Sequence, residues 1–520
     1  MRLLARGERR GIVWATVLFA GLLALWCVVA PPYRAADEPM HISTTLRLAD
    51  SGRYPAPGRA LMDPGVLASY GWVDYFGAGG RRPATVRPDY LAHAPSMRAL
   101  RSPQAPRPAT AIDQMTQHPP GYYLLMAGAV RLLHLQDLTP YGFVLALRLI
   151  STLLLLPLPW MCARVARRLG LTPAGAVAAA FLPAAWTQLL NTSAGVNNGT
   201  LQLLATTAAL AALVPVAQGD LRLRRALGVG ALVSVALLSK GFALALLPVI
   251  VVAYALGARG ASGTSRGRAA TALLGCLVAG LATLPGLWWW ILNVVRYGTV
   301  QPSGGISPPP WPVRPPLTFW EEQFATTFSR TLWFALGWAE NRPPLWLHVS
   351  VSVLFVLVLA AGTWFLRRQW RALVLLHLAW LGPLAITLLG SYLEFERSGA
   401  TRGVQGRYVQ VAVVGFALLA AALLDRSARL VGLVPGLVGL AAVSGLIWGV
   451  HHFWAPAPGD DQVLGRIRAM TSWWTGSTAL VLVSLAAVLA AAVLGLRAAR
   501  LTRAADAHLH SAGSSAHHGG

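Results

Sequence analysis

The sequence predicts an all-α polytopic membrane protein, and its composition and charge pattern carry this prediction. The 520 residues are 55% hydrophobic and only 12% charged, with a mean hydropathy of +0.54, whereas soluble domains carry about 25% charged residues. The apolar residues form uninterrupted blocks close to the roughly 20 residues that cross a bilayer core. The net charge of +24 is divided among short arginine clusters between these blocks. We therefore exclude a soluble domain, and we expect the lipid bilayer rather than nucleic acid as the partner of this charge.

The arginine clusters set the predicted topology. The positive-inside rule places seven of them in the cytoplasm, at residues 2–10, 164–168, 222–225, 259–268, 367–371, 425–429 and 497–503. The long polar segments then all fall on the outer side, at residues 31–118, 293–345, 391–407 and 451–476. This arrangement predicts about 12 transmembrane helices, with the N- and C-termini both cytoplasmic.

The acidic residues agree with this topology. Only four of the 19 Asp and Glu residues fall on the cytoplasmic side, namely Glu8, Asp220, Asp425 and Asp506. We predict a single integral membrane domain over residues 1–505, with its long outer loops forming a cap, and a disordered tail at 506–520. Ala-rich helices and a bias towards Arg are typical of a GC-rich bacterial genome, so we expect the plasma (inner) membrane of a bacterium.

Three segments need separate treatment along the chain. Residues 11–30 are expected to form a retained first helix, because no small-x-small cleavage site follows them. Pro119–Leu133 is short and carries a basic end, so we predict an interfacial helix there and the second crossing at Tyr141–Cys162. Residues 226–256 must leave the cytoplasm and return within fewer residues than the roughly 40 that two full crossings need. We therefore expect two short helices hinged near Ser239–Gly241.

The strongest chemical feature directly follows the first helix. Asp37 and Glu38 leave the bilayer side by side, and His41 comes one helical turn later. Partly desolvated carboxylates at this position suit a general base or a metal site. An alternative is that both acids only stabilise the first turn of the helix that begins at Pro39.

Two further motifs lie in the outer part of the predicted membrane domain. His118 and Tyr122 belong to the run Gln117-His118-Pro119-Pro120-Gly121-Tyr122-Tyr123, whose proline pair fixes the start of a helix. Lys240 is the only lysine in the chain. Ionisable groups near the bilayer are functional by default, and a lipid phosphate is the natural partner for an ammonium. Two alternatives remain: the residues around His118 only form the start of a helix, and the Lys240 side chain only extends towards the lipid headgroups.

A glycine-rich segment late in the chain carries the remaining cations. Arg402 and Arg407 flank Gly403-Val404-Gln405-Gly406, and Tyr408 follows. Arg makes forked hydrogen bonds to phosphate, and Gly lets the backbone approach a ligand. A turn with a snorkelling Arg belt and an interfacial Tyr explains the same residues. Glu340, near several tryptophans, is a further candidate for substrate contact.

Taken in order, these motifs resemble the GT-C superfamily of glycosyltransferases that use lipid-linked sugars. The likeness is closest to poorly characterised bacterial membrane families whose first outer loop opens with an Asp-Glu-Pro-x-His run. It is carried by Asp37-Glu38, by His118 to Tyr123, by Ser239-Lys240-Gly241 and by Gln405-Gly406-Arg407-Tyr408. It spans nearly the whole chain.

The resemblance implies transfer of a sugar from a polyprenyl-phosphate-linked donor to an envelope glycan, lipid or protein acceptor on the outer face of the membrane. Direct displacement would invert the anomeric centre. Asp37 or Glu38 would be the general base, and the donor phosphate would be bound by Lys240, Arg402 and Arg407. The substrate contacts would come from His41, His118, Tyr122, Tyr408 and Glu340. Many members carry a second outer acid where this chain has Asn197-Asn198-Gly199, so we expect no metal and no cofactor.

A secondary transporter is the main alternative. Transporters place polar sites at the bilayer midplane, on broken helices in corresponding positions of two halves. Here the charged candidates lie at the outer ends of helices, and the two halves of the sequence show no symmetry. A scaffold protein of envelope assembly is a third possibility, and its role would not depend on Asp37 or Glu38.

Overall fold

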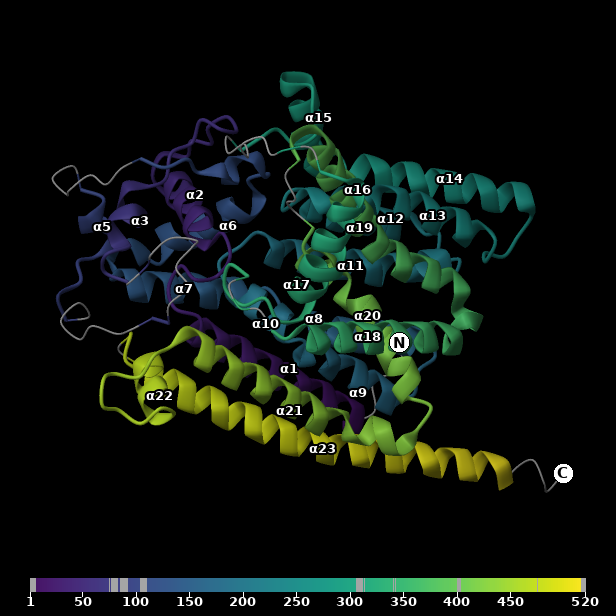
Figure 1. Ribbon diagram of the computed structural model, residues 1–520. Coiled ribbons are helices and arrows are strands. Elements are labelled where there is room, and N and C mark those ends of the chain that lie inside the picture. The colour runs from purple at the N-terminus through teal and green to yellow at the C-terminus, as the bar shows by residue number, and fades with distance from the viewer. Residues whose placement is uncertain are drawn as a thin grey trace.

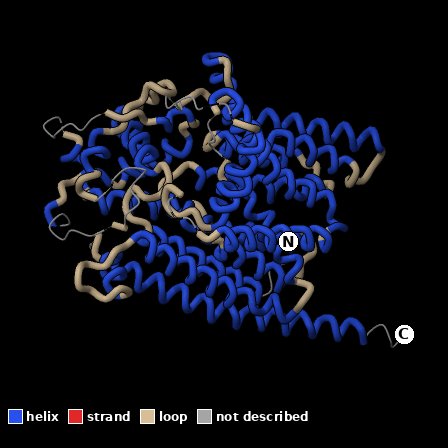
Figure 2. The backbone as a smooth tube through the Cα atoms, in the orientation of Figure 1, coloured by secondary structure: helices blue, strands red, loops and turns tan. Residues whose placement is uncertain are grey.

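Helices dominate the computed structural model. It describes residues 6–73, 75, 83–84, 92–102, 110–304, 312, 314–339, 341, 343–399, 404–474 and 476–515. Over these residues the regular elements are helices, and two isolated β-bridges are the only extended pairings (Figures 1 and 2). The all-α class predicted from composition is confirmed for this part of the chain.

The first half of the chain contains a long first helix, a group of short outer helices and then a series of apolar helices. In chain order these are α1 (Arg6–Val29), α2 (Glu38–Ser51), α3 (Pro64–Ser69), α5 (Met97–Leu100), η1 (Gln114–Gln117), α6 (Gly121–Leu132), η2 (Leu135–Asp137), α7 (Pro140–Leu153), α8 (Leu158–Arg168), α9 (Pro173–Phe181), η3 (Leu182–Ala185), α10 (Thr187–Ala194) and α11 (Gly199–Ala217).

The second half alternates long helices with short turns. It contains α12 (Leu223–Leu237), η4 (Gly241–Ala245), α13 (Leu246–Ala258), α14 (Ser265–Ala282), α15 (Leu284–Tyr297), α16 (Pro316–Phe319), η5 (Trp320–Phe328), α17 (Ser329–Trp333), α18 (Leu345–Phe365), η6 (Arg367–Gln369), α19 (Trp370–Ser398), η7 (Gly406–Ala412), α20 (Val413–Leu424), α21 (Ala428–Phe453), α22 (Leu464–Thr471) and α23 (Ser477–Ser515).

Within the described ranges, nine helices are long and apolar enough to cross a membrane. The number rises to 11 if each of two bent helix pairs, α9 to α10 and α14 to α15, forms one span. The protein is thus a multi-pass membrane protein. The expected second crossing is present as α7 and α8, which together form one candidate span at Pro140–Arg168.

The difference from the expected 12 crossings lies in α12. Helix α12 has 15 residues, and at 1.5 Å per residue it is about 22 Å long, shorter than the roughly 30 Å of a bilayer core. It ends at Leu237, and the chain turns through Ser239 and Lys240 before η4 and α13. The hinge predicted near Ser239–Gly241 is therefore present, and it separates two short helices.

Helix α1 lies at the centre of the helical bundle. It packs against α23, α9, α10 and α21, and Figure 1 shows α1, α21 and α23 running side by side. Most of its apolar side chains are fully buried, whereas α18 at the periphery is mostly exposed. An apolar helix surrounded by other helices needs no polar face, while an exposed apolar helix such as α18 fits a lipid-facing position.

The outer segment between α1 and α7 gathers at one end of the molecule, where α2, α3, α5 and α6 lie together (Figure 1). Helix α6 packs against α2 and buries Tyr122, Tyr123 and Met126, while Leu124 and Leu125 are exposed. This two-faced pattern is the one expected of an interfacial helix.

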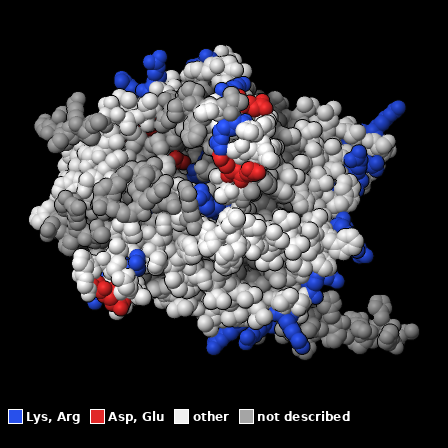
Figure 3. Space-filling model, viewed as in Figure 1, with Lys and Arg blue, Asp and Glu red and all other residues white. Residues whose placement is uncertain are grey.

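At the opposite end, both chain termini lie on one side of the bundle (Figure 1). Lys and Arg side chains gather along the right-hand and lower edges of the same view (Figure 3). Helix α23 continues to Ser515, well into the segment at 506–520 for which the sequence predicted disorder.

The packing of α12 against α14 predicts a position-specific cost for an added methyl group. A Cβ at Gly230 would overlap the carbonyl oxygen of Ala279, whereas a Cβ at Gly228 on the same helix would meet no atom of the described chain within 4 Å. We expect Gly230→Ala to destabilise the protein by roughly 1–3 kcal/mol through overpacking. Gly228→Ala should be neutral or stabilising, because Ala favours helix by about 1 kcal/mol over Gly.

Thermal unfolding of the two variants in the same detergent measures this difference. Equal melting temperatures for Gly230→Ala and Gly228→Ala would show that α12 and α14 do not approach as closely as the structure describes.

Candidate functional site

A cavity of about 530 Å³ lies between the outer segment and the helical bundle. Its walls come from the start of α2, the end of η1, α10, η4 and η7, which are far apart in the sequence. Asp37, Lys240 and Arg407 all line it. In the space-filling view, acidic and basic side chains meet in a hollow of the surface (Figure 3).

Asp37 reaches the cavity because of an unusual backbone conformation. It precedes α2 with φ 62° and ψ 4°, in the left-handed region, which side chains other than Gly rarely adopt. Its carboxylate lies 3.3 Å from Nη2 of Arg407, and the side chain is 26% exposed. Among the described residues it makes no side-chain hydrogen bond that caps α2. The alternative interpretation of Asp37 as a helix cap is therefore not supported.

Glu38 points away from the cavity and is fully buried. Its carboxylate accepts hydrogen bonds from Nε of Arg148 at 2.7 Å and from Nη2 of Arg148 at 2.6 Å. The backbone N–H of Val196 donates a third bond at 3.0 Å. Glu38 is absent from the described lining of the cavity, and its carboxylate is already bound by Arg148 and by the Val196 N–H. The structure thus separates two neighbouring carboxylates that the sequence left equivalent, and the expectation of Glu38 as base is not supported.

Arg148 is a functional-site neighbour that the sequence analysis missed. It is fully buried in α7, and it also donates to the carbonyl oxygens of Cys27, Ala30 and Pro31 at 2.8, 2.5 and 2.8 Å. An arginine inside a candidate membrane span indicates a buried polar contact, because a charged side chain there needs a partner. Here the partners are the last turn of α1 and Glu38, so Arg148 fixes where the chain enters α2.

Lys240 and Arg407 form the cationic side of the cavity. Nζ of Lys240 lies 5.5 Å from the centroid of the Tyr408 ring and 5.8 Å from that of Phe242. The guanidinium of Arg407 lies 5.6 Å from the Tyr408 ring centroid. Burial, together with the charge of Arg407, lowers the pKa of Lys240 to about 8. Both cations thus share one aromatic neighbour, and Tyr408, an expected substrate contact, lines the cavity.

The two predicted histidines also line the cavity. Nδ1 of His41 lies 2.9 Å from the Tyr123 hydroxyl. Burial lowers the pKa of His41 well below its usual value, and the nearby charge of Lys240 adds to the effect. Burial and Lys240 likewise lower the pKa of His118 to about 3. Both side chains are therefore neutral near pH 7, and they can donate or accept a hydrogen bond without adding charge.

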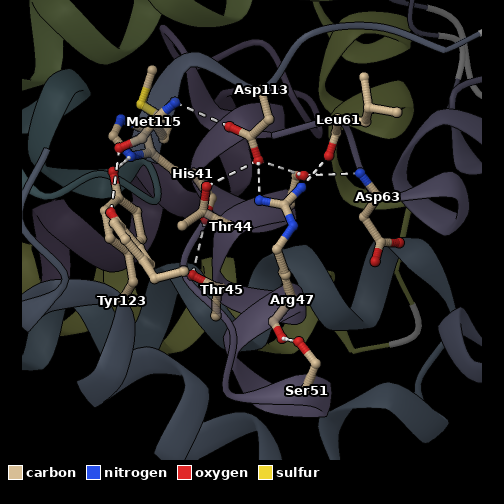
Figure 4. A network of polar contacts seen from close by, with 12 residues as sticks. His41, Thr44, Thr45, Arg47, Ser51, Leu61, Asp63, Asp113, Met115 and Tyr123 are labelled. Atoms are coloured by element: carbon tan, nitrogen blue, oxygen red, sulfur yellow. Dashed lines mark hydrogen bonds and ion pairs between the residues drawn. The ribbon is translucent and has the colours of Figure 1, made fainter. Parts of the chain in front are cut away.

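A buried carboxylate ties η1 to α2 and was not foreseen from the sequence. Asp113 accepts hydrogen bonds from Ser43 at 2.7 Å, from Thr44 at 2.9 Å and from Arg47 at 3.3 Å (Figure 4). Its other oxygen accepts from the backbone N–H of Met115. Burial raises the pKa of Asp113. This network holds the segment that carries His118 against the helix that follows Asp37.

Three predicted residues are not among the described residues that line the cavity. Tyr122 is fully buried, pairs with the Ser151 hydroxyl at 3.0 Å and is not part of the described cavity lining. The described geometry does not support the expected substrate contact of Tyr122, because the side chain packs into the core next to Tyr123. Arg402 and Glu340 lie outside the described residues. The described part of the chain holds no group of three or more His, Cys, Asp or Glu side chains arranged to bind a metal ion.

The Arg148–Glu38 pair leads to a stability prediction. Removing one partner of a buried ion pair costs about 3–5 kcal/mol, because the other charge stays buried alone. We expect Arg148→Met and Glu38→Gln each to lower the melting temperature strongly. The double variant should lose less than the sum of the two, because it leaves no unpaired charge. Additive losses in thermal unfolding would contradict a direct coupling between the two side chains.

The comparisons with known proteins give one family and several similar structures, among them two crystal structures of ArnT. The apo crystal structure of ArnT from Cupriavidus metallidurans matches with a TM-score of 0.45 and 14% identity, over 94% of this chain and 75% of that chain. The structure of the same protein bound to undecaprenyl phosphate matches with a TM-score of 0.45 and 15% identity, over 94% and 76%. No curated protein matches the chain.

The family model that matches is described as "Predicted membrane protein (DUF2142)" and covers residues 19–415, more than half of the chain. The matched range contains Asp37, His41 and Lys240, and it extends to Arg407. This chain therefore belongs to the DUF2142 family of predicted membrane proteins.

Proposed function

We propose that this protein is a membrane glycosyltransferase. It moves a sugar from a polyprenyl-phosphate-linked donor to an acceptor on the outer face of the membrane, in the assembly of a cell-envelope glycan. The observation that carries the proposal is the cavity in which one carboxylate, Asp37, faces two cations, Lys240 and Arg407. A base for the acceptor and a binding site for an anionic leaving group are both needed for such a transfer.

The charge balance of the cavity favours a phosphate ligand. Near pH 7 the two histidines are neutral, and Lys240 and Arg407 outnumber Asp37 by one positive charge. The guanidinium offers a forked set of donors to phosphate oxygens, and the ammonium adds a compact point charge. A phosphodiester, which carries one negative charge, would neutralise the described part of the cavity.

The lipid part of the donor also has a path from this site. Leu244 and Ile386 line the cavity, and each lies in a candidate membrane span. The Ile386 side chain is 41% exposed on the outside of the helical bundle. A prenyl chain that leaves the cavity beside Ile386 would follow α19 into the bilayer while its phosphate stays at Lys240 and Arg407. The lipid bound in one of the similar ArnT structures, undecaprenyl phosphate, is a suitable probe.

The reaction follows from this placement. The acceptor oxygen attacks the anomeric carbon, its proton passes to the Asp37 carboxylate, and the bond between that carbon and the phosphate oxygen breaks. Lys240 and Arg407 stabilise the charge that develops on the departing phosphate. Because the oxygen enters opposite the leaving group, the configuration at the anomeric carbon inverts.

Asp37 provides the first test. General-base catalysis contributes about 10²–10⁴-fold to a rate, so Asp37→Asn should reduce sugar transfer, or hydrolysis of the donor, by at least about 100-fold. Binding of undecaprenyl phosphate should be kept or improved, because Arg407 loses its internal partner. Asp137→Asn is the matched control, since the Asp137 carboxylate is an outer residue paired with Arg98 at the surface.

The assay uses protein in lipid nanodiscs with a panel of polyprenyl-phosphate sugars. Full activity in Asp37→Asn, or equal losses in Asp37→Asn and Asp137→Asn, would remove Asp37 from the proposed role. In a parallel experiment with the protein in sealed liposomes, uptake of a ligand without sugar transfer would instead favour the transporter.

Lys240 provides a pH test. Its ammonium is protonated below about pH 8 and loses its charge above that value. The second pKa of a phosphate monoester is about 6, so the lipid keeps its charge across this range. We therefore expect the affinity for undecaprenyl phosphate to fall by roughly 10-fold as the pH rises through about 8. Lys240→Arg should bind with little change over the same range.

Binding is measured by native mass spectrometry or by titration in nanodiscs. An affinity of the parent protein that does not change between about pH 7 and about pH 10 would remove the Lys240 ammonium from the phosphate site.

A further inference from the structure

We infer that the sugar carried by the donor is uncharged and that its hydroxyl groups are bound by a set of neutral amide and hydroxyl side chains next to the phosphate site. The inference rests on the proposed function and deepens it by naming the class of sugar. Five side chains make up this set, which we call the amide set: Gln188, Asn191, Thr200, Gln202 and Gln410.

Two members of the amide set face the main cavity. Gln188 and Asn191 lie on α10, are each 3% exposed and line the cavity wall. Oε1 of Gln188 and Oδ1 of Asn191 have no hydrogen-bond partner among the described residues. The Gln188 side chain is held in place, because its Nε2 donates to the Thr192 hydroxyl at 3.1 Å. Both oxygens are therefore buried acceptors in the cavity wall that no donor of the described chain satisfies.

The other three members line a smaller chamber of about 50 Å³. Thr200 and Gln202 are 1% exposed on α11, and Gln410 is 4% exposed in η7. Oγ1 of Thr200 and the Nε2 atoms of Gln202 and Gln410 also lack a partner in the described chain. This chamber is roughly large enough for one or two water molecules, or for a hydroxyl or hydroxymethyl group of a ligand.

The small chamber and the main cavity share the three charged side chains. Asp37, Lys240 and Arg407 line both of them. The amide set thus lies on two sides of the place where the donor phosphate would bind. A sugar attached to that phosphate would have its ring in the main cavity and one hydroxyl-bearing edge in the chamber.

The chemistry of the free atoms indicates what they bind. Buried polar atoms without partners are costly, and nearly all such atoms in proteins are paired. Here amide oxygens, amide nitrogens and a hydroxyl are all left unpaired around one site. A polyol can pair with both the unpaired donors and the unpaired acceptors, because each of its hydroxyl groups donates one hydrogen bond and accepts others.

The charged side chains in the described lining favour a neutral sugar. Among the described residues, Asp37, Lys240 and Arg407 are the only charged groups that line either space, since His41 and His118 are neutral. An amino sugar would bring its ammonium close to two cations without an added carboxylate. A uronic acid would compete with the phosphate for the same two cations.

The first measurement compares lipids on the parent protein in nanodiscs. The probes are undecaprenyl phosphate, a panel of polyprenyl-phosphate neutral hexoses and pentoses, and the corresponding amino sugar and uronic acid. We expect at least one neutral sugar lipid to bind about 10-fold more tightly than undecaprenyl phosphate, a gain of about 1.4 kcal/mol. The amino sugar and the uronic acid should show no such gain. A preference for either charged sugar would overturn the inference.

Matched variants on α11 then test which side chains are responsible for the tighter binding of the neutral sugar lipid. Thr200→Val removes a hydroxyl that lines the chamber. Thr207→Val removes an equally buried, unpartnered hydroxyl that contributes to neither described lining. We expect Thr200→Val to reduce the gain for the neutral sugar by several-fold while undecaprenyl phosphate still binds, and Thr207→Val to bind like the parent. Gln202→Met is a second variant, with the larger expected loss, and melting temperatures check its folding.

The outcomes separate this inference from the proposed function. If undecaprenyl phosphate binds but Thr200→Val and Gln202→Met keep the full gain for the neutral sugar, the inference is overturned and the phosphate site stands. If neither undecaprenyl phosphate nor any sugar lipid binds to the folded parent protein, the proposed function is overturned and the inference fails with it.

Discussion

The ion pair between Arg148 and Glu38 is the interaction on which the geometry of the site depends. Arg148 holds the last carbonyl groups of α1, and Glu38 also accepts the N–H of Val196, which precedes α11. The end of α1, α2, α7 and the segment before α11 are thereby joined at one fully buried point. Because Glu38 is committed inward, the left-handed turn at Asp37 directs the neighbouring carboxylate outward into the cavity. Neither acid can take the place of the other without breaking this junction.

The cavity then collects charge from three distant parts of the chain. Asp37 precedes α2, Lys240 lies at the break between two short helices, and Arg407 enters the membrane domain at η7. Breaks in apolar helices provide such positions, because a polar side chain at the end of a helix can face a cavity while the flanking residues stay in the bilayer. Because α12 is short, it ends before Lys240, and this places Lys240 at the break where its side chain can face the cavity.

The sequence predicts the parts of this arrangement that depend on local pattern. Apolar blocks predict the helices, and the conspicuous polar residues between them include Asp37, Lys240 and Arg407. The direction in which a side chain points depends on contacts with distant parts of the chain. The different orientations of Asp37 and Glu38 require a left-handed backbone at Asp37 and the position of Arg148. The sequence analysis took Arg148 only as part of a membrane crossing. Gln202 escaped notice for the same reason, since a lone amide in an apolar block gains its meaning only from an adjoining cavity.

In the proposed reaction, the Asp37–Arg407 ion pair also links the base to the donor. Arg407 is the partner of the Asp37 carboxylate at 3.3 Å. A donor phosphate competes for the same guanidinium, and a phosphate with forked hydrogen bonds is the stronger partner. Asp37 is then released to accept a proton from the acceptor hydroxyl. The same residue that binds the leaving group thus makes the base available only when the donor is in place, which links activation to the presence of the substrate.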